Sequence, residues 1–224
     1  MGVGQFYCPI VGQNYCPLTK GSIPKKTVLY SIAGSLLGVL STGIYSLLSR
    51  RQQYIQLLSE ELAKDIKVLI SQGEGPMVEF KSSFRWDIKQ SKINQALEFV
   101  ALKTIAGFMN SDGGTLLIGV TDEGNIIGLE KDYQSLRKEN RDGFEQAVIT
   151  AVSVNLGTDL CQRIMIVFHS IDGLDICRVI VMQSSRPVYI EHSGNQKFYA
   201  RTGGSTREMN IKEAVEFIAA RWPK

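Results

Sequence analysis

An uncharged run of 22 residues, at positions 27–48, constrains this 224-residue chain more than any other feature. As an α-helix rising about 1.5 Å per residue, it is long enough to cross the hydrocarbon core of a bilayer. Basic pairs lie on both sides, at Lys25–Lys26 and at Arg50–Arg51. Serines and threonine recur within the run, so a buried amphipathic helix is the alternative. We predict one transmembrane helix over residues 27–48, in a single-pass membrane protein.

The same run carries small residues on one helical face, at Gly34, Gly38 and Thr42. Such a face lets two membrane helices approach closely, which offers a route to a homodimer. Positive charges flank both ends in similar number, so charge alone does not set the orientation. Ahead of the run, Cys8 and Cys16 could pair within or between chains if they face an oxidising compartment.

The charge distribution limits what the rest of the chain can bind. Residues 1–49 contain Lys20, Lys25 and Lys26 and no acid, so residues 50–224 hold 22 basic against 22 acidic residues. A neutral domain has no general attraction to phosphate. Any affinity for nucleic acid must therefore come from a local basic surface.

Hydrophobic periodicity and turn residues divide the chain into four parts: an N-terminal segment 1–26, the membrane helix 27–48, a linker helix 49–72 and a globular domain 73–224. Apolar periodicity and turn residues predict helices over 52–72, 92–109, 133–154 and 211–222. Strands are predicted over 78–84, 115–120, 126–129, 164–168, 176–182, 188–191 and 197–201, mostly joined as hairpins. This order is typical of an α+β fold with a mixed or antiparallel sheet flanked by helices.

Acidic residues and a lysine lie at the ends of short apolar runs. Glu79 and Lys81 are two positions apart, so on a strand they point to the same face. Glu74 precedes them, and Asp122 follows the next apolar run. This set could hold a divalent metal against a phosphodiester. The alternative is an edge strand with ordinary solvated charges.

Three blocks in this order resemble the Schlafen AlbA_2 domain, over approximately residues 60–222. The first has the order Gly-Glu-x4-Glu-Phe-Lys. The second runs from Phe108 through a Gly-Gly-Thr-Leu-x-Ile-Gly-Val-x-Asp sequence, and the third is Phe-Tyr-x-Arg-x-Gly-x-Ser-Thr-Arg, ending at Arg207. The resemblance implies the α+β fold of that family.

The resemblance also implies an activity, because Schlafen nucleases cut structured RNA with three metal-binding carboxylates. Those acids correspond here to Glu74, Glu79 and Asp122, which would hold Mg²⁺ or Mn²⁺, and Lys81 corresponds to the family's motif lysine. Together with the predicted membrane helix, it implies a membrane-anchored endoribonuclease acting on tRNA-like RNA in stress or phage defence, with residues 50–224 in the cytoplasm. Large animal relatives join two such lobes, so this single lobe is expected to form a homodimer or to assemble with another Schlafen-like lobe.

We expect local basic and aromatic residues to bind the nucleic acid. The candidates flank the first strand and the last glycine turn: Arg85, Trp86, Lys89, Lys92, Arg201 and Arg207. Two other functions remain open. One is a non-catalytic nucleic-acid-binding module. The other is ATP binding, for which the chain lacks a Gly-x4-Gly-Lys-Ser/Thr motif.

Overall fold

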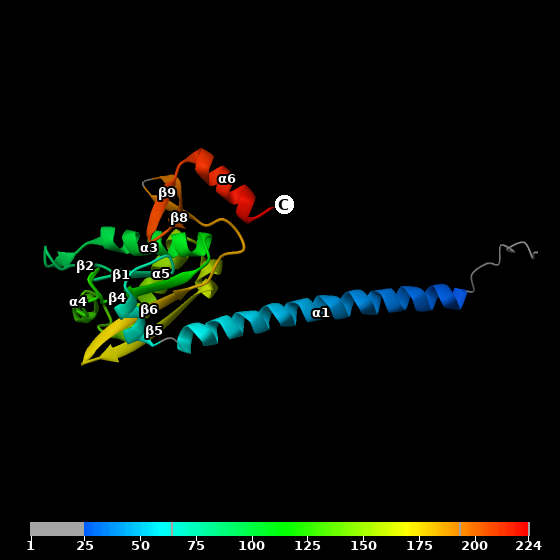
Figure 1. The fold of residues 1–224 in the computed structure, drawn as a ribbon, viewed down its shortest axis with the longest axis horizontal. Helices are drawn as coiled ribbons and strands as arrows, with labels where there is room; N and C mark the ends of the chain where they lie inside the picture. Colours follow the sequence, from blue (N-terminus) through cyan, green and yellow to red (C-terminus); the bar gives the residue numbers. More distant parts are fainter. Residues whose placement is uncertain (1–24, 64, 193, 224) are drawn as a thin grey trace, which may run out of the picture. The chain divides into compact units, whose positions relative to one another are not determined.

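The structure is a computed structural model that describes residues 25–63, 65–192 and 194–223 (Figure 1). The chain divides into two compact units, Met1–Glu60 and Glu61–Lys224. The N-terminal segment with Cys8 and Cys16 lies outside the described residues.

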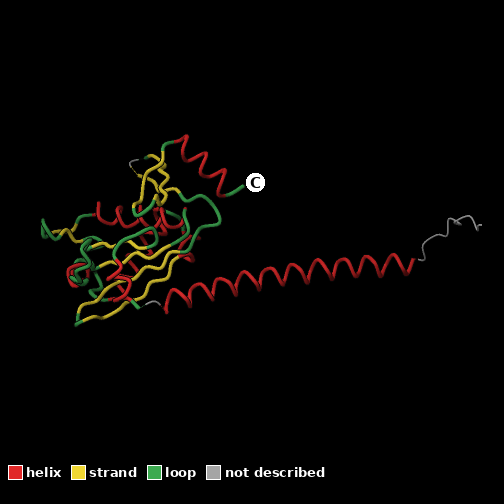
Figure 2. Tube along the Cα trace, in the orientation of Figure 1, coloured by secondary structure: helices red, strands yellow, loops and turns green. Residues whose placement is uncertain are grey.

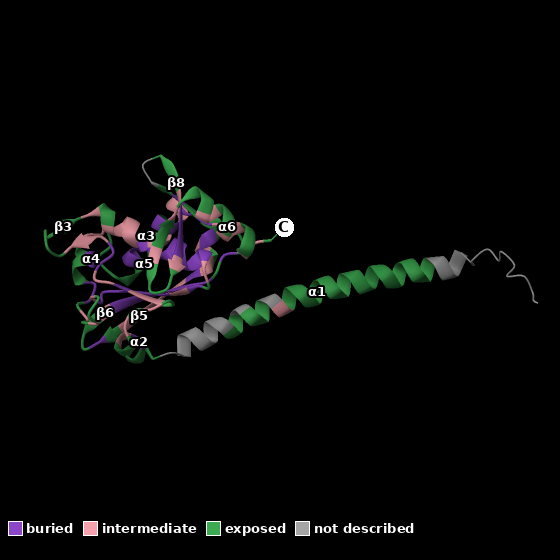
Figure 3. Cartoon of the chain, turned by 45° about the horizontal axis from the view of Figure 1, so that its top comes forward, coloured by how far each residue is buried: buried purple, intermediate pink, exposed green. Residues whose placement is uncertain are grey.

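Helix α1, Lys25–Ala63, forms the described part of the first unit and continues three residues past its boundary at Glu60. Its segment Leu29–Gln53 spans 25 residues and is long and apolar enough to cross a membrane. A signal sequence near an N-terminus has the same length and apolar composition. These two properties therefore show an apolar N-terminal helix. Most of its described length is exposed (Figure 3). Leu36 and Leu37 are among its exposed apolar residues.

The helix predicted over 52–72 is interrupted. Helix α1 ends at Ala63 and a separate helix, α2, runs over Ile66–Gln72. The Asp65 side chain accepts a hydrogen bond from the backbone N–H of Lys67 at 2.8 Å and so begins α2 with its own N-cap. Apolar periodicity does not reveal this break, because the same stripe continues through both helices.

A four-stranded mixed sheet forms the centre of the second unit (Figure 2). Its strands are β1 (Val78–Lys81), β4 (Gly114–Ile118), β6 (Leu174–Val181) and β5 (Ile164–Ile171), in the order β1-β4-β6-β5. Strand β1 is parallel to β4, and the other pairs are antiparallel. The predicted α+β class with a mixed sheet is confirmed.

Helices cover both faces of this sheet. On one face, α3 (Gln95–Asn110) and α5 (Arg141–Asn155) pack over Leu116, Ile118 and Val179. On the other, α2 packs over strand residues that include Phe80 and Leu117. The alternation of side chains along β1 and β4 assigns each residue to one of these two cores.

Two short elements precede β5. Helix α4 spans Glu130–Gln134, and a 3₁₀ helix, η1, spans Thr158–Arg163. The single helix predicted over 133–154 is therefore two, α4 and α5, separated by an irregular loop. Asn140 begins α5 by accepting a hydrogen bond from the backbone N–H of Gly143 at 3.0 Å.

A second sheet has three antiparallel strands, β7 (Tyr189–His192), β8 (Asn195–Thr202) and β9 (Ser205–Met209), followed by helix α6 (Ile211–Arg221). The sequence predicts β7, β8 and α6 but not β9, whose first residues it places in the turn after β8. The pairing of Thr202 with Ser205 shows that the turn is tighter than expected and that β9 follows it directly.

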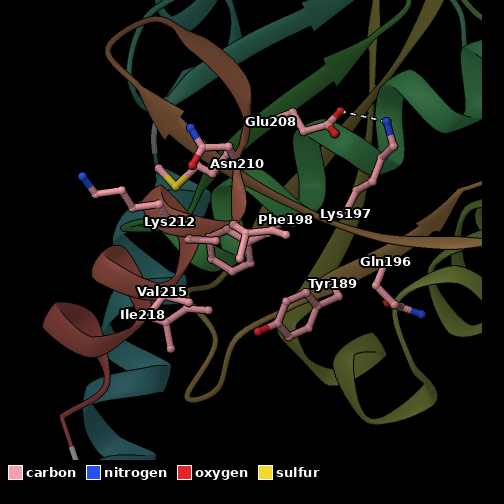
Figure 4. A pocket seen from close by; sticks show the side chains of 12 residues that line it. Tyr189, Gln196, Lys197, Phe198, Glu208, Asn210, Lys212, Val215 and Ile218 are labelled. Carbon is pink, nitrogen blue, oxygen red and sulfur yellow. Dashed lines mark hydrogen bonds and ion pairs between the residues drawn. The ribbon is translucent and has the colours of Figure 1, made fainter.

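Helix α6 leaves an apolar groove of about 660 Å³ against this second sheet (Figure 4). Tyr189 and Phe198 lie on the sheet side, with ring centroids 5.5 Å apart, and Val215 and Ile218 lie on the helix side. At the open end, Ile211 is 87% exposed. The groove is separate from the predicted acidic site.

The hairpin predicted from 115–120 and 126–129 is not formed. The described residues 126–129 contain no strand, and only an isolated bridge joins Val120 to Ile126. Gly119 and Gly128 both have positive φ, and the carbonyl of Gly119 accepts hydrogen bonds from the N–H groups of Ile127 and Gly128. This bend ends the pairing, and β4 instead lies between β1 and β6.

A short hairpin unforeseen in the sequence, β2 (Trp86–Asp87) with β3 (Lys92–Ile93), lies between β1 and α3. Its turn is closed by the Asp87 carboxylate, which accepts hydrogen bonds from the backbone N–H groups of Lys89 and Gln90 at 3.0 and 2.9 Å. The hairpin lies at one end of the domain (Figure 1).

Candidate functional site

Strand β1 places Glu79 and Lys81 on the face of the sheet that α3 covers, since their parallel partners are Leu116 and Ile118. The Lys81 ammonium donates to Glu79 Oε1 at 2.7 Å. The prediction that these two side chains share a face is thus correct. Their exposed fractions are 22% for Lys81 and 14% for Glu79, so this is not an open, solvated pair.

The other oxygen of Glu79 is bound by Arg201 from β8. Arg201 Nη1 donates to Glu79 Oε2 at 2.7 Å, and the Arg201 side chain is only 4% exposed. The guanidinium also donates to the carbonyls of Gly75 and Pro76, and it lies over the ring of Phe108 at 4.7 Å from the ring centroid. Arg201 therefore joins the second sheet to the chain leading into β1.

The predicted role of Arg201 as a phosphate contact does not fit this placement. Its Nε, Nη1 and Nη2 atoms all donate to protein oxygens, and almost none of the side chain reaches the surface. The planar fork of an arginine suits such a multi-point structural contact.

The environment of Glu79 acts on its pKa in two directions. Burial by itself raises the pKa, but the hydrogen bonds and charges of Lys81 and Arg201 together outweigh burial. The net effect is a pKa lowered from the usual value. Glu79 is thus an ionised carboxylate with a cation at each oxygen.

Glu74 forms a hydrogen bond with the backbone of β1, on the edge of that strand that faces away from β4. Its Oε1 accepts a hydrogen bond from the backbone N–H of Phe80 at 2.7 Å, and Lys81 Nζ lies 3.9 Å from the same oxygen. An edge strand presents unpaired N–H groups, and a carboxylate folded back on one of them satisfies it. Glu74 therefore closes part of the sheet edge.

Asp122 lies in the exposed turn after β4, where the N–H of Gly124 donates to the carbonyl of Thr121 at 2.8 Å. Its side chain makes no hydrogen bond or ion pair within the described part of the chain. Among residues 25–63, 65–192 and 194–223, no group of three or more histidine, cysteine or acidic side chains is arranged to hold a metal ion. The donor set of Glu74, Glu79 and Asp122 does not fit Mg²⁺ or Mn²⁺ in this conformation, because Lys81 and Arg201 occupy the oxygens of Glu79.

Three of the other predicted contact residues, Trp86, Lys89 and Lys92, lie on the β2–β3 hairpin. Lys89 and Lys92 are exposed and form no ion pair with any described residue. Ile88 and Ile93 are 51% and 46% exposed on the same hairpin, and Trp86 is half-buried. We call these five residues, Trp86, Ile88, Lys89, Lys92 and Ile93, the hairpin surface.

Two of the predicted basic residues are paired. Arg85 Nε lies 3.2 Å from Glu98 Oε1, with both side chains about a quarter exposed. Arg207 Nη2 donates to Glu213 Oε1 at 2.8 Å, and its side chain is 56% exposed. An exposed pair of this kind contributes little to stability, so Arg207 can exchange its partner for a phosphate at small cost.

A residue that the sequence analysis missed, Asp132, fixes the base of the hairpin. Its buried carboxylate accepts hydrogen bonds from the Ser83 hydroxyl at 2.9 Å and from the backbone N–H groups of Phe84, Arg85 and Trp86 at 3.1, 2.9 and 3.1 Å. Burial raises the pKa of Asp132, and these donors partly offset it. The sequence signal is weak, because Asp132 directly follows Glu130 and Lys131 on a short helix and resembles an ordinary surface charge.

Asn110, directly after the helix predicted over 92–109, has a structural role beyond the end of that helix. It is the last residue of α3, and it is fully buried. Its Nδ2 donates to the carbonyls of Val188 and Tyr199 at 2.8 Å each, and its Oδ1 accepts from the N–H of Val188 at 2.8 Å. One amide side chain thus joins α3 to β8 and to the segment entering β7.

The solved structures that resemble this chain include two of low sequence identity. One is the crystal structure of the DIP2311 protein from Corynebacterium diphtheriae, at 20% identity and a TM-score of 0.48, covering 77% of this chain and 33% of that one. The present chain thus spans about a third of that protein. The other is the solution structure of the N-terminal domain of a RecG-related protein from Nitrosomonas europaea, at 19% identity and a TM-score of 0.38, covering 70% of this chain and 92% of that one.

A comparison with curated proteins gives no match. The family comparison is more informative, because the family described as "Schlafen, AlbA_2" matches residues 74–210. This range begins at Glu74, includes β1, the hairpin surface and Arg201, and ends at the N-cap of α6. Since it covers more than half of the sequence, the chain belongs to the Schlafen AlbA_2 family.

Proposed function

We propose that this domain binds nucleic acid through the hairpin surface, and that this nucleic acid is RNA. Family membership suggests a function related to nucleic acid. The observation that supports this surface is that one short hairpin carries two exposed lysines, Lys89 and Lys92, together with the half-buried Trp86. Lysines bind phosphates, and an aromatic ring stacks on bases, so the hairpin combines the two parts of a single-strand binding surface.

Charge supports a local contact of this kind. The domain is neutral overall, so its long-range attraction to a strand is weak. Many of the other basic side chains are already paired with acids, including Lys81, Arg141 and Arg186. The hairpin lysines form no such ion pair within the described residues, so their ammonium groups remain available to a phosphate.

Charge reversal on the hairpin tests this proposal. The full-length chain in detergent micelles, with Lys89→Glu and Lys92→Glu together, should bind a fluorescent single-stranded RNA about tenfold more weakly than the wild type at moderate salt. The slope of log affinity against log salt should fall by about 1.4 units, roughly 0.7 for each lost phosphate contact to a single strand.

A matched double variant, Lys67→Glu with Lys212→Glu, changes the net charge equally on α2 and α6. If both double variants lose affinity to the same extent, binding is diffuse and the hairpin is not the site. Retained binding by the control, with loss by the hairpin variant, supports the proposal.

A metal-dependent endoribonuclease acting on tRNA-like RNA is the second candidate. Incubation of the full-length chain with total tRNA and Mn²⁺ or Mg²⁺ tests it directly. The informative variant is Asp122→Asn, because Asp122 is exposed and its loss should leave the fold intact. Glu123→Gln, in the same turn, is the control. Cleavage by the wild type and by Glu123→Gln, but not by Asp122→Asn, would favour the nuclease over simple binding.

The remaining expectations of the sequence analysis, on assembly and on membrane attachment, are also proposals. A homodimer, or assembly with a second Schlafen-like lobe, would present two hairpin surfaces to one RNA, and membrane attachment through residues 27–48 would raise their local concentration. Light scattering of the full-length chain in micelles measures the assembly state. Flotation with liposomes, compared with a chain beginning after residue 60, measures membrane attachment.

A further inference from the structure

A cavity of about 280 Å³ opens beside the hairpin surface. Its apolar lining is formed by Trp86 and Ile88 from the hairpin and by Ile127 from the bend after β4. Its polar lining includes Ser82, Thr121 and Lys131. The volume lies just below the range of about 300–1,000 Å³ for ligand sites, which suits a ligand of about one ring system and no larger.

The lining fits a flat heteroaromatic ring. An indole and aliphatic side chains offer faces for stacking, and the Ser82 hydroxyl offers both a donor and an acceptor to ring nitrogens and exocyclic groups. The Ser82 hydroxyl makes no hydrogen bond within the described residues, so it is free to bind such an edge. A purely apolar ligand would leave this hydroxyl and the Lys131 ammonium without a role.

Buried hydrogen bonds fix the backbone that forms one wall of the cavity. Asp132 and Ser83 are buried members of its lining, and the Trp86 backbone N–H donates both to Asp132 Oδ1 and to Ser83 Oγ, at 3.1 and 2.8 Å. The carboxylate already accepts four donors, so it does not require a cation from the cavity. Its effect is to fix the backbone that carries the Trp86 side chain, which lowers the entropy cost of binding.

We propose that this cavity receives a single unstacked nucleobase, with Trp86 as the stacking surface and Ser82 at the base edge. The inference rests on the proposed function, since the phosphates on either side of that base would lie against Lys89 of the hairpin surface and Lys131. It adds that the hairpin distinguishes unpaired bases from duplex, because a paired base is not free to enter the cavity.

Tryptophan fluorescence of the full-length chain tests the inference, because Trp86 and Trp222 are its two tryptophans. In a Trp222→Phe background, Trp86 is the single reporter. The probes are an eight-nucleotide oligoadenylate, an abasic oligomer with the same number of phosphates, and free adenosine. The oligoadenylate should quench Trp86 and bind at least fivefold more tightly than the abasic oligomer, since stacking of one base contributes about 1–3 kcal/mol.

Two isoleucines of the hairpin make a matched pair of variants. Ile88 lines the cavity and Ile93 does not, although the two side chains are similarly exposed, at 51% and 46%. Ile88→Ala should reduce oligoadenylate affinity about threefold and leave abasic binding unchanged, whereas Ile93→Ala should change neither. Ser82→Phe, which fills the cavity from its rim, should abolish quenching by free adenosine.

The possible outcomes separate the two proposals. Equal affinity for oligoadenylate and abasic oligomer, with unchanged Trp86 fluorescence, would overturn the base cavity and leave phosphate binding by the hairpin in place. Quenching by adenosine without binding of either oligomer would retain the cavity as a nucleotide site and overturn the proposed function. No response to any of the three probes would overturn both.

Discussion

Arg201 Nη1 lies 2.7 Å from Glu79 Oε2, across a sequence separation of 122 residues. This ion pair joins β1 at the edge of the main sheet to β8 of the second sheet. With exposed fractions of 4% and 14%, the two side chains are largely out of water. The acid that the family resemblance assigns to metal binding is therefore also a structural residue here, and its removal has consequences beyond any activity.

We expect Glu79→Ala to lower the free energy of unfolding by about 3 kcal/mol, because it leaves the buried Arg201 charge without its carboxylate. Urea denaturation followed by circular dichroism measures this. The control is Asp142→Ala, which removes the acid of an exposed ion pair with Lys138 and should cost less than about 1 kcal/mol. Equal losses for the two variants would show that the Glu79–Arg201 pair contributes no more to the free energy of unfolding than an exposed ion pair does.

The lowered pKa of Glu79 predicts an acid sensitivity. Because its folded pKa is below the ordinary value of 4.5, its contribution to stability is fully present above that pH and is lost as the pH falls through the folded pKa. The wild type should therefore lose more unfolding free energy between pH 7 and pH 3 than Glu79→Gln does. Parallel pH profiles for the two proteins would contradict this assignment.

Asp132→Ala should destabilise the domain and loosen the hairpin. It removes a buried acceptor from three backbone N–H groups and one hydroxyl, for which a loss of about 1–3 kcal/mol is expected. Hydrogen exchange at the amides of Phe84, Arg85 and Trp86 should become faster, and RNA binding should weaken if the hairpin is the site. Glu130→Ala, an exposed substitution in the same helix, should leave the exchange rates unchanged.

Asn110→Asp should be among the most damaging single-atom changes in the domain. It replaces a donor to two carbonyls by a carboxylate oxygen in a fully buried position, at a cost of several kcal/mol. Thermal unfolding measures the loss. Asn155→Asp, where the side chain donates only to its own helix at Ala151, is the matched control and should be far milder. Similar melting temperatures for the two variants would argue against Asn110 as the link to the second sheet.

Local patterns predict those parts of the fold that local chemistry determines. The β5–β6 hairpin follows from two apolar runs around Asp172 and Gly173, both of which have positive φ in the turn. The capping box at Asn210 and Glu213 marks the start of α6. By contrast, parallel pairing of β1 with β4 depends on a crossover through the hairpin and α3, which no short pattern encodes.

In the candidate site too, the sequence predicts local geometry but not the contacts that depend on tertiary packing. Sequence spacing correctly places Glu79 and Lys81 on one face, because a strand has a period of two. It does not show that Arg201 faces inward, because inward and outward positions of β8 depend on how the second sheet packs on α3. Nor does it separate Asp132 from its charged neighbours, since burial of a carboxylate is a property of the folded surroundings.

The three hydrogen bonds of Asn110 also bear on synthesis of the chain. Its partners, Val188 and Tyr199, are translated well after α3 and after every strand of the main sheet. Until they emerge from the ribosome, the end of α3 holds an amide with no partner and an apolar face with no cover. A nascent chain stopped after β6 should therefore remain open to proteolysis at α3, and the domain becomes protected only when its final sheet is released.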